Sequence, residues 1–150
     1  MQGFNGKSGR VHVIQFVYGD CLLEGIQSYI DNEEIKNAVV IAGLGTMETC
    51  NIHSVSTTDF PVKNEYSFFG LQALGVSSVN GFIANGQPHI HITFSDYENG
   101  QITTYTGHLE NESKVLCRME IMLLEMEGVE LERYVNENEI EILRPVAAEV

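Results

Sequence analysis

The sequence has no long hydrophobic run and no apolar segment near its start. The first residues, MQGFNGKSGRV, lack the apolar stretch and the small-residue cleavage site of an export signal. No later segment has the number of consecutive apolar residues that a bilayer-spanning helix needs. We therefore expect a soluble, cytoplasmic protein that has no membrane partner.

Basic residues are scarce. Eight lysines and arginines stand against 21 aspartates and glutamates, which gives a formal net charge of −13. More than half of the excess lies between Glu110 and Glu141, and we expect this segment to form a solvated acidic face that keeps the protein in solution. Nucleic-acid affinity comes largely from Lys and Arg that displace condensed counterions. The charge therefore argues against direct DNA binding.

Cysteine pairs and nucleotide-binding motifs are also missing. The three cysteines, Cys21, Cys50 and Cys117, are widely spaced and form no C-x-x-C pair, so neither a disulfide framework nor a thiolate zinc site is predicted. We expect buried free thiols. The stretch AGLGTME has Glu48 where a dinucleotide fingerprint needs its third glycine, and no P-loop is present. No cofactor-binding residue other than metal ligands is therefore assigned.

The pattern of apolar residues predicts one α+β domain with a mostly antiparallel sheet and one or two short helices. An amphipathic helix capped by Asp20 is expected to run to about residue 31. Segment 114–126 fits either a helix or a strand, since it satisfies both periodicities. A bulge is expected near Gly70 or Gly75, and the polar residues 57–67 form a predicted loop. Strands are predicted at 10–20, 37–45, 49–58, 68–78, 88–109 as a hairpin, 129–135 and 139–143.

Three of the five histidines lie on the predicted hairpin PHIHITFSDYENGQITTYTGHL. Side chains alternate between the faces of a strand, so His89 and His91 point the same way. A four-residue loop, Tyr97 to Gly100, would place His108 directly opposite His89 on that face. A change of one residue in the register would move His108 to the other surface of the sheet.

Three neutral imidazoles that converge from two strands can bind a transition metal and leave a coordination position open. Zinc suits such a set, as do iron, nickel, cobalt and manganese. The alternative is a set of ordinary polar residues on a half-exposed sheet face, or a hydrogen-bonded cluster at a subunit contact. His12 and His53 are expected to be hydrogen-bonded sheet histidines outside the site. The spacing assigns no catalytic residue.

One motif is specific, P-H-x-H…G-H-L, formed by Pro88, His89, His91, Gly107, His108 and Leu109. With the order of the predicted elements, it resembles the PPC domain, the plants and prokaryotes conserved domain, from about Arg10 to about Leu143. The resemblance implies an antiparallel α+β domain assembled as a homotrimer, with a transition metal on three histidines that match His89, His91 and His108. It also favours a strand for 114–126. We expect the metal to be zinc.

Two functions follow from the resemblance. In plants the domain accompanies AT-hooks, and the family is commonly described as DNA-binding. This chain has no R-G-R-P core, and Ser67 to Gln72 departs from the plant G-R-F-E-I-L stretch, so a regulatory module with indirect DNA association is expected. The fold is also similar to acetolactate decarboxylase, which suggests as the alternative a metal-dependent lyase or hydrolase for a small acidic substrate. In either case water or a small acidic ligand completes the metal shell, and no arginine or glutamate partner is identified.

The expected domain organisation is simple. Residues 1–9 are expected to be loose or disordered, residues 10–145 to form the domain, and residues 146–150 to form a tail.

Overall fold

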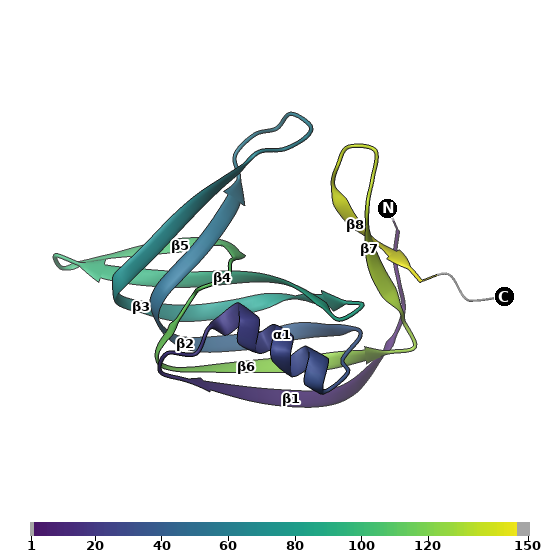
Figure 1. Cartoon of the computed structure of the whole chain (residues 1–150), viewed down its shortest axis with the longest axis horizontal. Helices are drawn as coiled ribbons and strands as arrows, with labels where there is room; N and C mark the ends of the chain where they lie inside the picture. Colours follow the sequence, from purple (N-terminus) through teal and green to yellow (C-terminus); the bar gives the residue numbers. More distant parts are fainter. Residues whose placement is uncertain (1, 147–150) are drawn as a thin grey trace.

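The computed structural model describes residues 2–146, and these residues form one helix and eight strands (Figure 1). The antiparallel α+β class expected from the sequence is confirmed. The elements are β1 (Lys7–Val17), α1 (Leu22–Asn32), β2 (Ala38–Val55), β3 (Asn64–Ala84), β4 (Gln87–Glu98), β5 (Gln101–Leu109), β6 (Val115–Glu127), β7 (Leu131–Val135) and β8 (Glu141–Pro145).

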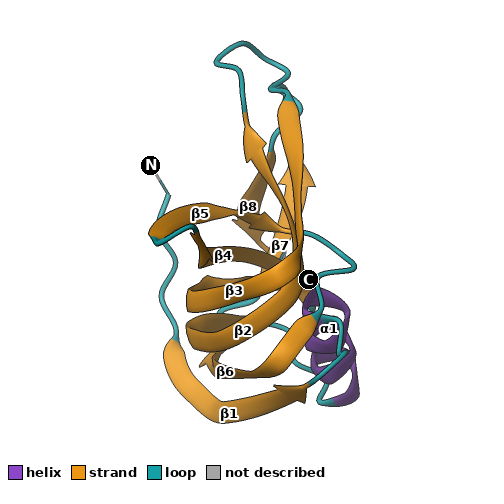
Figure 2. Cartoon of the chain, turned by 90° about the vertical axis from the view of Figure 1, so that its left-hand side faces the viewer, coloured by secondary structure: helices purple, strands orange, loops and turns teal. Residues whose placement is uncertain are grey.

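Six strands form a curved antiparallel sheet in the order β1-β6-β2-β3-β4-β5 (Figure 2). β2 also pairs with β5 through Ile52 and His53, so the far end of β2 closes on the other edge of the sheet. β7 and β8 form a separate two-stranded hairpin. Segment 114–126 lies almost entirely in strand β6, as the family resemblance favoured.

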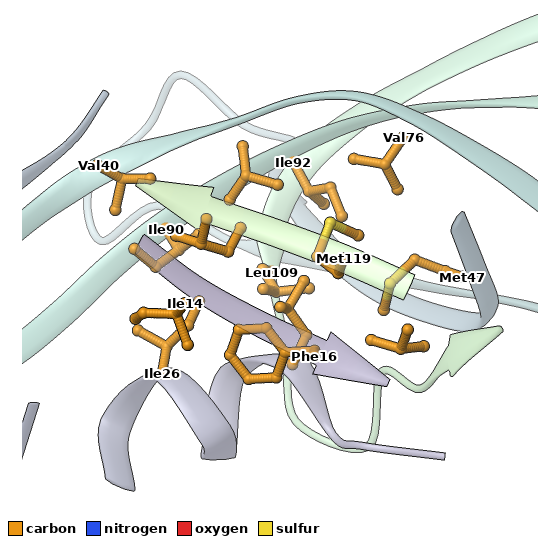
Figure 3. Close-up of a cluster of buried hydrophobic side chains, with 14 of the residues drawn as sticks. Ile14, Phe16, Ile26, Val40, Met47, Val76, Ile90, Ile92, Leu109 and Met119 are labelled. Atoms are coloured by element: carbon orange, nitrogen blue, oxygen red, sulfur yellow. The ribbon is translucent and has the colours of Figure 1, made fainter. Parts of the chain in front are cut away.

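The helix α1 covers one face of the sheet (Figure 1). Its side chains Leu22, Ile26 and Ile30 are buried against the sheet, and each such burial contributes about 1.5–3 kcal/mol. Alternate residues of β4, Ile90 and Ile92, belong to the same core (Figure 3). His89 and His91, which alternate with these two isoleucines along β4, consequently project from the opposite face of the sheet.

The helix begins differently from the expectation. Cys21 is the N-cap residue and makes no side-chain capping hydrogen bond. Asp20 instead accepts a hydrogen bond from the backbone N–H of Val17 at 2.8 Å, so its carboxylate closes the turn that precedes the helix. The prediction that Asp20 caps α1 is therefore wrong.

One pair of predicted strands merges into a single long, bent strand, and a third predicted strand is longer than expected. Segments 37–45 and 49–58 both lie largely in β2, and 68–78 lies inside β3, which begins earlier, at Asn64. The register of pairing between β2 and β3 shifts between Met47 and Thr49. Leu71, on the facing part of β3, has a φ of +61°. This irregularity lies close to Gly70, where a bulge was expected. Beyond it, β2 and β3 continue as an arm that projects from the sheet (Figure 1).

At the N-terminal side, β1 begins at Lys7, so Lys7, Ser8 and Gly9 belong to the sheet although they fall within the segment expected to be loose. The expected tail, 146–150, lies outside the described residues except for Val146. The one helix found within residues 2–146 is too short to cross a membrane.

Candidate metal centre

The β4–β5 hairpin turns through two residues rather than four. Asn99 and Gly100 both have positive φ, +53° and +82°, as the tight hairpin turn with a right-handed twist requires. Glu98 is therefore opposite Gln101, and His108 is opposite His91. The predicted pairing of His108 with His89 is wrong by two residues. Because side chains alternate with a period of two, the shift leaves His108 on the predicted face.

His89, His91 and His108 come together on the face of the sheet opposite α1. Their nearest ring nitrogens all lie within 4.8 Å of one another. The Nε2 atoms of His89 and His91 are 3.4 Å apart, while the ring centroids are 5.4 Å apart, so the nitrogens occupy the facing edges of the two rings. The ring of His108 lies 4.1 Å from that of His89 and 4.6 Å from that of His91, centroid to centroid.

These distances suit a tetrahedral ion. Two nitrogens that are each ~2.0–2.1 Å from such an ion lie ~3.3–3.4 Å apart, by the geometry of a tetrahedron. The separation between the Nε2 atoms of His89 and His91 is 3.4 Å. Three imidazoles leave one tetrahedral position open, as in catalytic zinc sites. The cluster could therefore hold one transition-metal ion.

The protonation state of the three rings also suits metal ligands. Burial lowers the pKa of all three imidazoles below the ordinary value of 6.5. For His108 the pKa falls to about 4, because burial is reinforced by the positive charge that His89, His53 and His91 would carry. The rings are accordingly neutral near pH 7, which is the form that binds metals.

His53, expected to lie outside the site, stacks directly on His108. The pairing of β2 with β5 places the two residues opposite each other, with ring centroids 4.3 Å apart and planes inclined by 14°. The Nδ1 atom of His53 is 2.5 Å from a carboxylate oxygen of Glu110. The prediction that His53 is hydrogen-bonded is right. The prediction that it lies away from the histidine cluster is wrong, because the pairing of β2 with β5 brings His53 next to His108.

His53, His108 and Glu110 also have ligand atoms within 4.8 Å of one another. Two of these candidate ligand atoms are already bonded to each other, because the Nδ1 atom of His53 and the Glu110 carboxylate form a hydrogen bond. We therefore treat the His53–Glu110 pair as support behind His108 rather than as ligands.

His12 is the hydrogen-bonded sheet histidine that was expected. It is buried, with Nδ1 3.0 Å from the hydroxyl oxygen of Tyr29 and Nε2 2.5 Å from a carboxylate oxygen of Glu125. Arg10 donates to the same glutamate oxygen at 2.8 Å. This network joins β1, β6 and α1 and has no part in the candidate metal centre.

A pocket of about 450 Å³ opens beside His89 and His91 and is closed on one side by the β7–β8 hairpin. Arg133 of β7 and Glu141 of β8 line it. These two residues are the arginine and glutamate neighbours that sequence reasoning missed. No local motif marks them, since the hairpin reaches the site only by folding back over the sheet.

Comparison with known proteins shows the same fold in several solved structures. A metal-containing protein from Archaeoglobus fulgidus has a TM-score of 0.76 and 20% identity, with 95% of this chain and 98% of that chain covered. A plant- and prokaryote-conserved (PPC) protein from Pyrococcus horikoshii has a TM-score of 0.78 and 21% identity, with 98% and 99% covered. A candidate DNA-binding protein from Bacteroides thetaiotaomicron has a TM-score of 0.74 and 14% identity, with 93% and 96% covered.

A search of curated protein sequences found no match. The model of the Plants and Prokaryotes Conserved (PCC) domain, by contrast, matches residues 3–127, which include every strand of the large sheet and all three histidines of the cluster. The likeness of fold and the family match agree with the resemblance seen in the P-H-x-H…G-H-L motif. The chain belongs to the Plants and Prokaryotes Conserved domain family.

Proposed function

We propose that this protein is a homotrimeric metal-binding protein that holds one transition-metal ion, zinc, on His89, His91 and His108. The observation that carries the proposal is the 3.4 Å separation of the facing Nε2 atoms of His89 and His91, with His108 close to both. Water or a small acidic ligand completes the shell. The metal-containing protein from Archaeoglobus fulgidus, which shares the fold, supports the proposal.

Elemental analysis of the purified protein tests the proposal. We expect about one zinc ion per chain in the wild type and a large loss in each of His89→Ala, His91→Ala and His108→Ala. After the metal is removed, dialysis against zinc should restore the metal content of the wild type but not that of the three variants. Unchanged metal content in His108→Ala would rule out the proposed ligand set.

Among the possible roles of this protein we favour a regulatory one, and we expect any association with DNA to be indirect. The fold likeness to the candidate DNA-binding protein from Bacteroides thetaiotaomicron motivates a direct test. A chain with a net charge of −13 repels phosphate backbones. We therefore expect no retention of duplex DNA in filter binding at low ionic strength. Retention that weakens steeply with added salt would instead establish direct binding.

The alternative function is a metal-dependent lyase or hydrolase that acts on a small acidic substrate. The pocket beside His89 and His91 favours it, because enzymes bind substrates in such concave spaces next to an open coordination position. In that reaction the metal would act as a Lewis acid that stabilises developing negative charge. A metal found with four protein ligands and no open position would exclude this alternative.

A further inference from the structure

The β7–β8 hairpin carries an arginine whose position over the sheet is held by the backbone of the neighbouring strands. One terminal nitrogen of Arg133 donates to the carbonyl oxygen of Gln87 at 2.9 Å, and the other donates to the carbonyl oxygen of Phe82 at 3.3 Å. Phe82 is paired with His89, and Gln87 lies two residues before it. The guanidinium group is therefore held next to the first histidine of the cluster.

These two hydrogen bonds leave most of the donors of Arg133 free. A guanidinium group has five N–H donors, and two are used here. Burial lowers the pKa of Arg133, although the group stays charged at neutral pH. Arg133 lines the same pocket as His89 and His91, so the guanidinium group lies beside the histidine cluster.

The balance of charge in the pocket favours an anion. An ion on three neutral imidazoles keeps its full positive charge, and Arg133 adds another. Glu141 is the negatively charged side chain among the described residues that line this pocket, and it offsets part of that positive charge. The centre would thus be positive within a protein whose overall charge is −13.

The remaining walls are largely apolar. Val39, Phe82 and Leu143 line the pocket, and its volume of about 450 Å³ lies within the range usual for small-molecule sites. The space therefore suits a molecule with one charged end and an apolar remainder. A carboxylate with an apolar remainder fits such a space, because the planar fork of an arginine and a metal ion can bind its two oxygens together.

We propose that this pocket binds a small carboxylate with an apolar tail, its carboxylate lying between the metal position and Arg133. The proposal rests on the proposed function, since it places one carboxylate oxygen at the open position of the ion. To the proposed function it adds the chemical class of the ligand, a carboxylate, and the residue that recognises it, Arg133. The hairpin that supplies Arg133 lies beyond residues 3–127, the part of the chain that matches the family model.

Isothermal titration of the zinc-loaded protein with isovalerate, a branched carboxylate, tests the proposal, and isovaleramide serves as the uncharged control. We expect isovalerate to bind and isovaleramide to bind at least about tenfold more weakly, since a hydrogen bond to a charged group is lost. Inorganic phosphate is a second probe. Equal binding of the amide, or binding of phosphate without isovalerate, would overturn the choice of a carboxylate.

Variants assign the role of Arg133. Arg133→Gln should weaken isovalerate binding about tenfold or more. Arg144→Gln is the matched control, since Arg144 lies on the same hairpin but is paired with Glu132 at 2.7 Å, and its affinity should stay within about twofold of wild type. Unchanged affinity in Arg133→Gln would overturn the assignment.

Loss of the two bonds to Phe82 and Gln87 could also displace the hairpin in Arg133→Gln, so a second variant leaves Arg133 in place. Glu141→Gln removes the negative charge beside Arg133 and should tighten isovalerate binding about twofold or more. Weaker binding in this variant would contradict the proposed charge balance.

Metal content, measured on the same samples, separates the two proposals. An absence of bound zinc refutes the proposed function, whereas bound zinc without isovalerate binding refutes this inference alone.

Discussion

His91 on β4 lies directly opposite His108 on β5, and their ring centroids are 4.6 Å apart. A two-residue turn at Asn99 and Gly100 sets this register. All three histidines of the candidate centre therefore belong to one hairpin, whose pairing is local in sequence. The position of β5, however, also depends on its contact with β2, where His53 meets His108.

Gly107 allows this close contact between β5 and β2. A Cβ atom at this position would lie 2.8 Å from the carbonyl oxygen of His53 and 3.1 Å from the Cβ atom of Ile52. Gly107→Ala should therefore push the strands apart and lower the free energy of unfolding by about 1–3 kcal/mol. Urea unfolding measures the change. Gly75→Ala is the matched control, because the nearest atom to its Cβ would be 3.9 Å away, and equal stability of the two variants would contradict this account.

The His53–Glu110 pair should support the metal centre without supplying ligands. Glu110→Gln and His53→Asn are expected to keep about one zinc ion per chain and to weaken zinc affinity by about tenfold, the lower end of the effect of supporting residues in metal sites. Competition with a chelator gives the affinities. A loss of zinc stoichiometry in Glu110→Gln comparable to that in His91→Ala would show instead that the ligands are His53, His108 and Glu110, the other group with suitable spacing.

Cys50 should be unreactive in the folded protein. Burial raises the pKa of its thiol from 9.0 to about 12, so the folded state holds this proton more tightly than the unfolded state. The resulting stabilisation is complete below pH 9 and is lost as the pH rises toward about 12. Iodoacetamide in mildly alkaline buffer should label the exposed Cys117 and spare Cys50 until urea is added. Between those pH values, the unfolding free energy of Cys50→Ala should fall less steeply than that of the wild type, and an identical slope would contradict the prediction.

Self-association should be visible as a mass of three chains. Val11, Val13 and Val17 of β1, an edge strand, are each more than half exposed, and such a row of apolar side chains is typical of an interface. Light scattering should give about 50 kDa, three times the chain mass of 16.7 kDa. Val11→Ser combined with Val13→Ser should lower that value. A wild-type mass of 16.7 kDa would refute the trimer.

The shared face of the three histidines could be predicted because strand side chains alternate with a period of two. The exact pairing was predicted wrongly, although Asn99-Gly100 is the dipeptide most typical of a two-residue hairpin turn and would have given the observed register. Asp20 shows a limit of the sequence itself, because a carboxylate at this place can cap a helix or accept a hydrogen bond from the backbone of Val17.

His53 and Arg133 could not be assigned to the site from the sequence, because neither belongs to a local motif. His53 arrives through the bend of β2 and its contact with β5, and Arg133 arrives through the return of the β7–β8 hairpin over the sheet. Both are consequences of tertiary packing, which alternation and turn signals within a single segment do not encode.

X-ray absorption at the zinc edge of the purified protein tests the central claim most directly. The account predicts a shell of nitrogen and oxygen atoms at ~2.0–2.1 Å with the multiple scattering of three imidazoles, reduced in His91→Ala. A shell that contains sulfur at ~2.3 Å, or one without imidazole scattering, would contradict it.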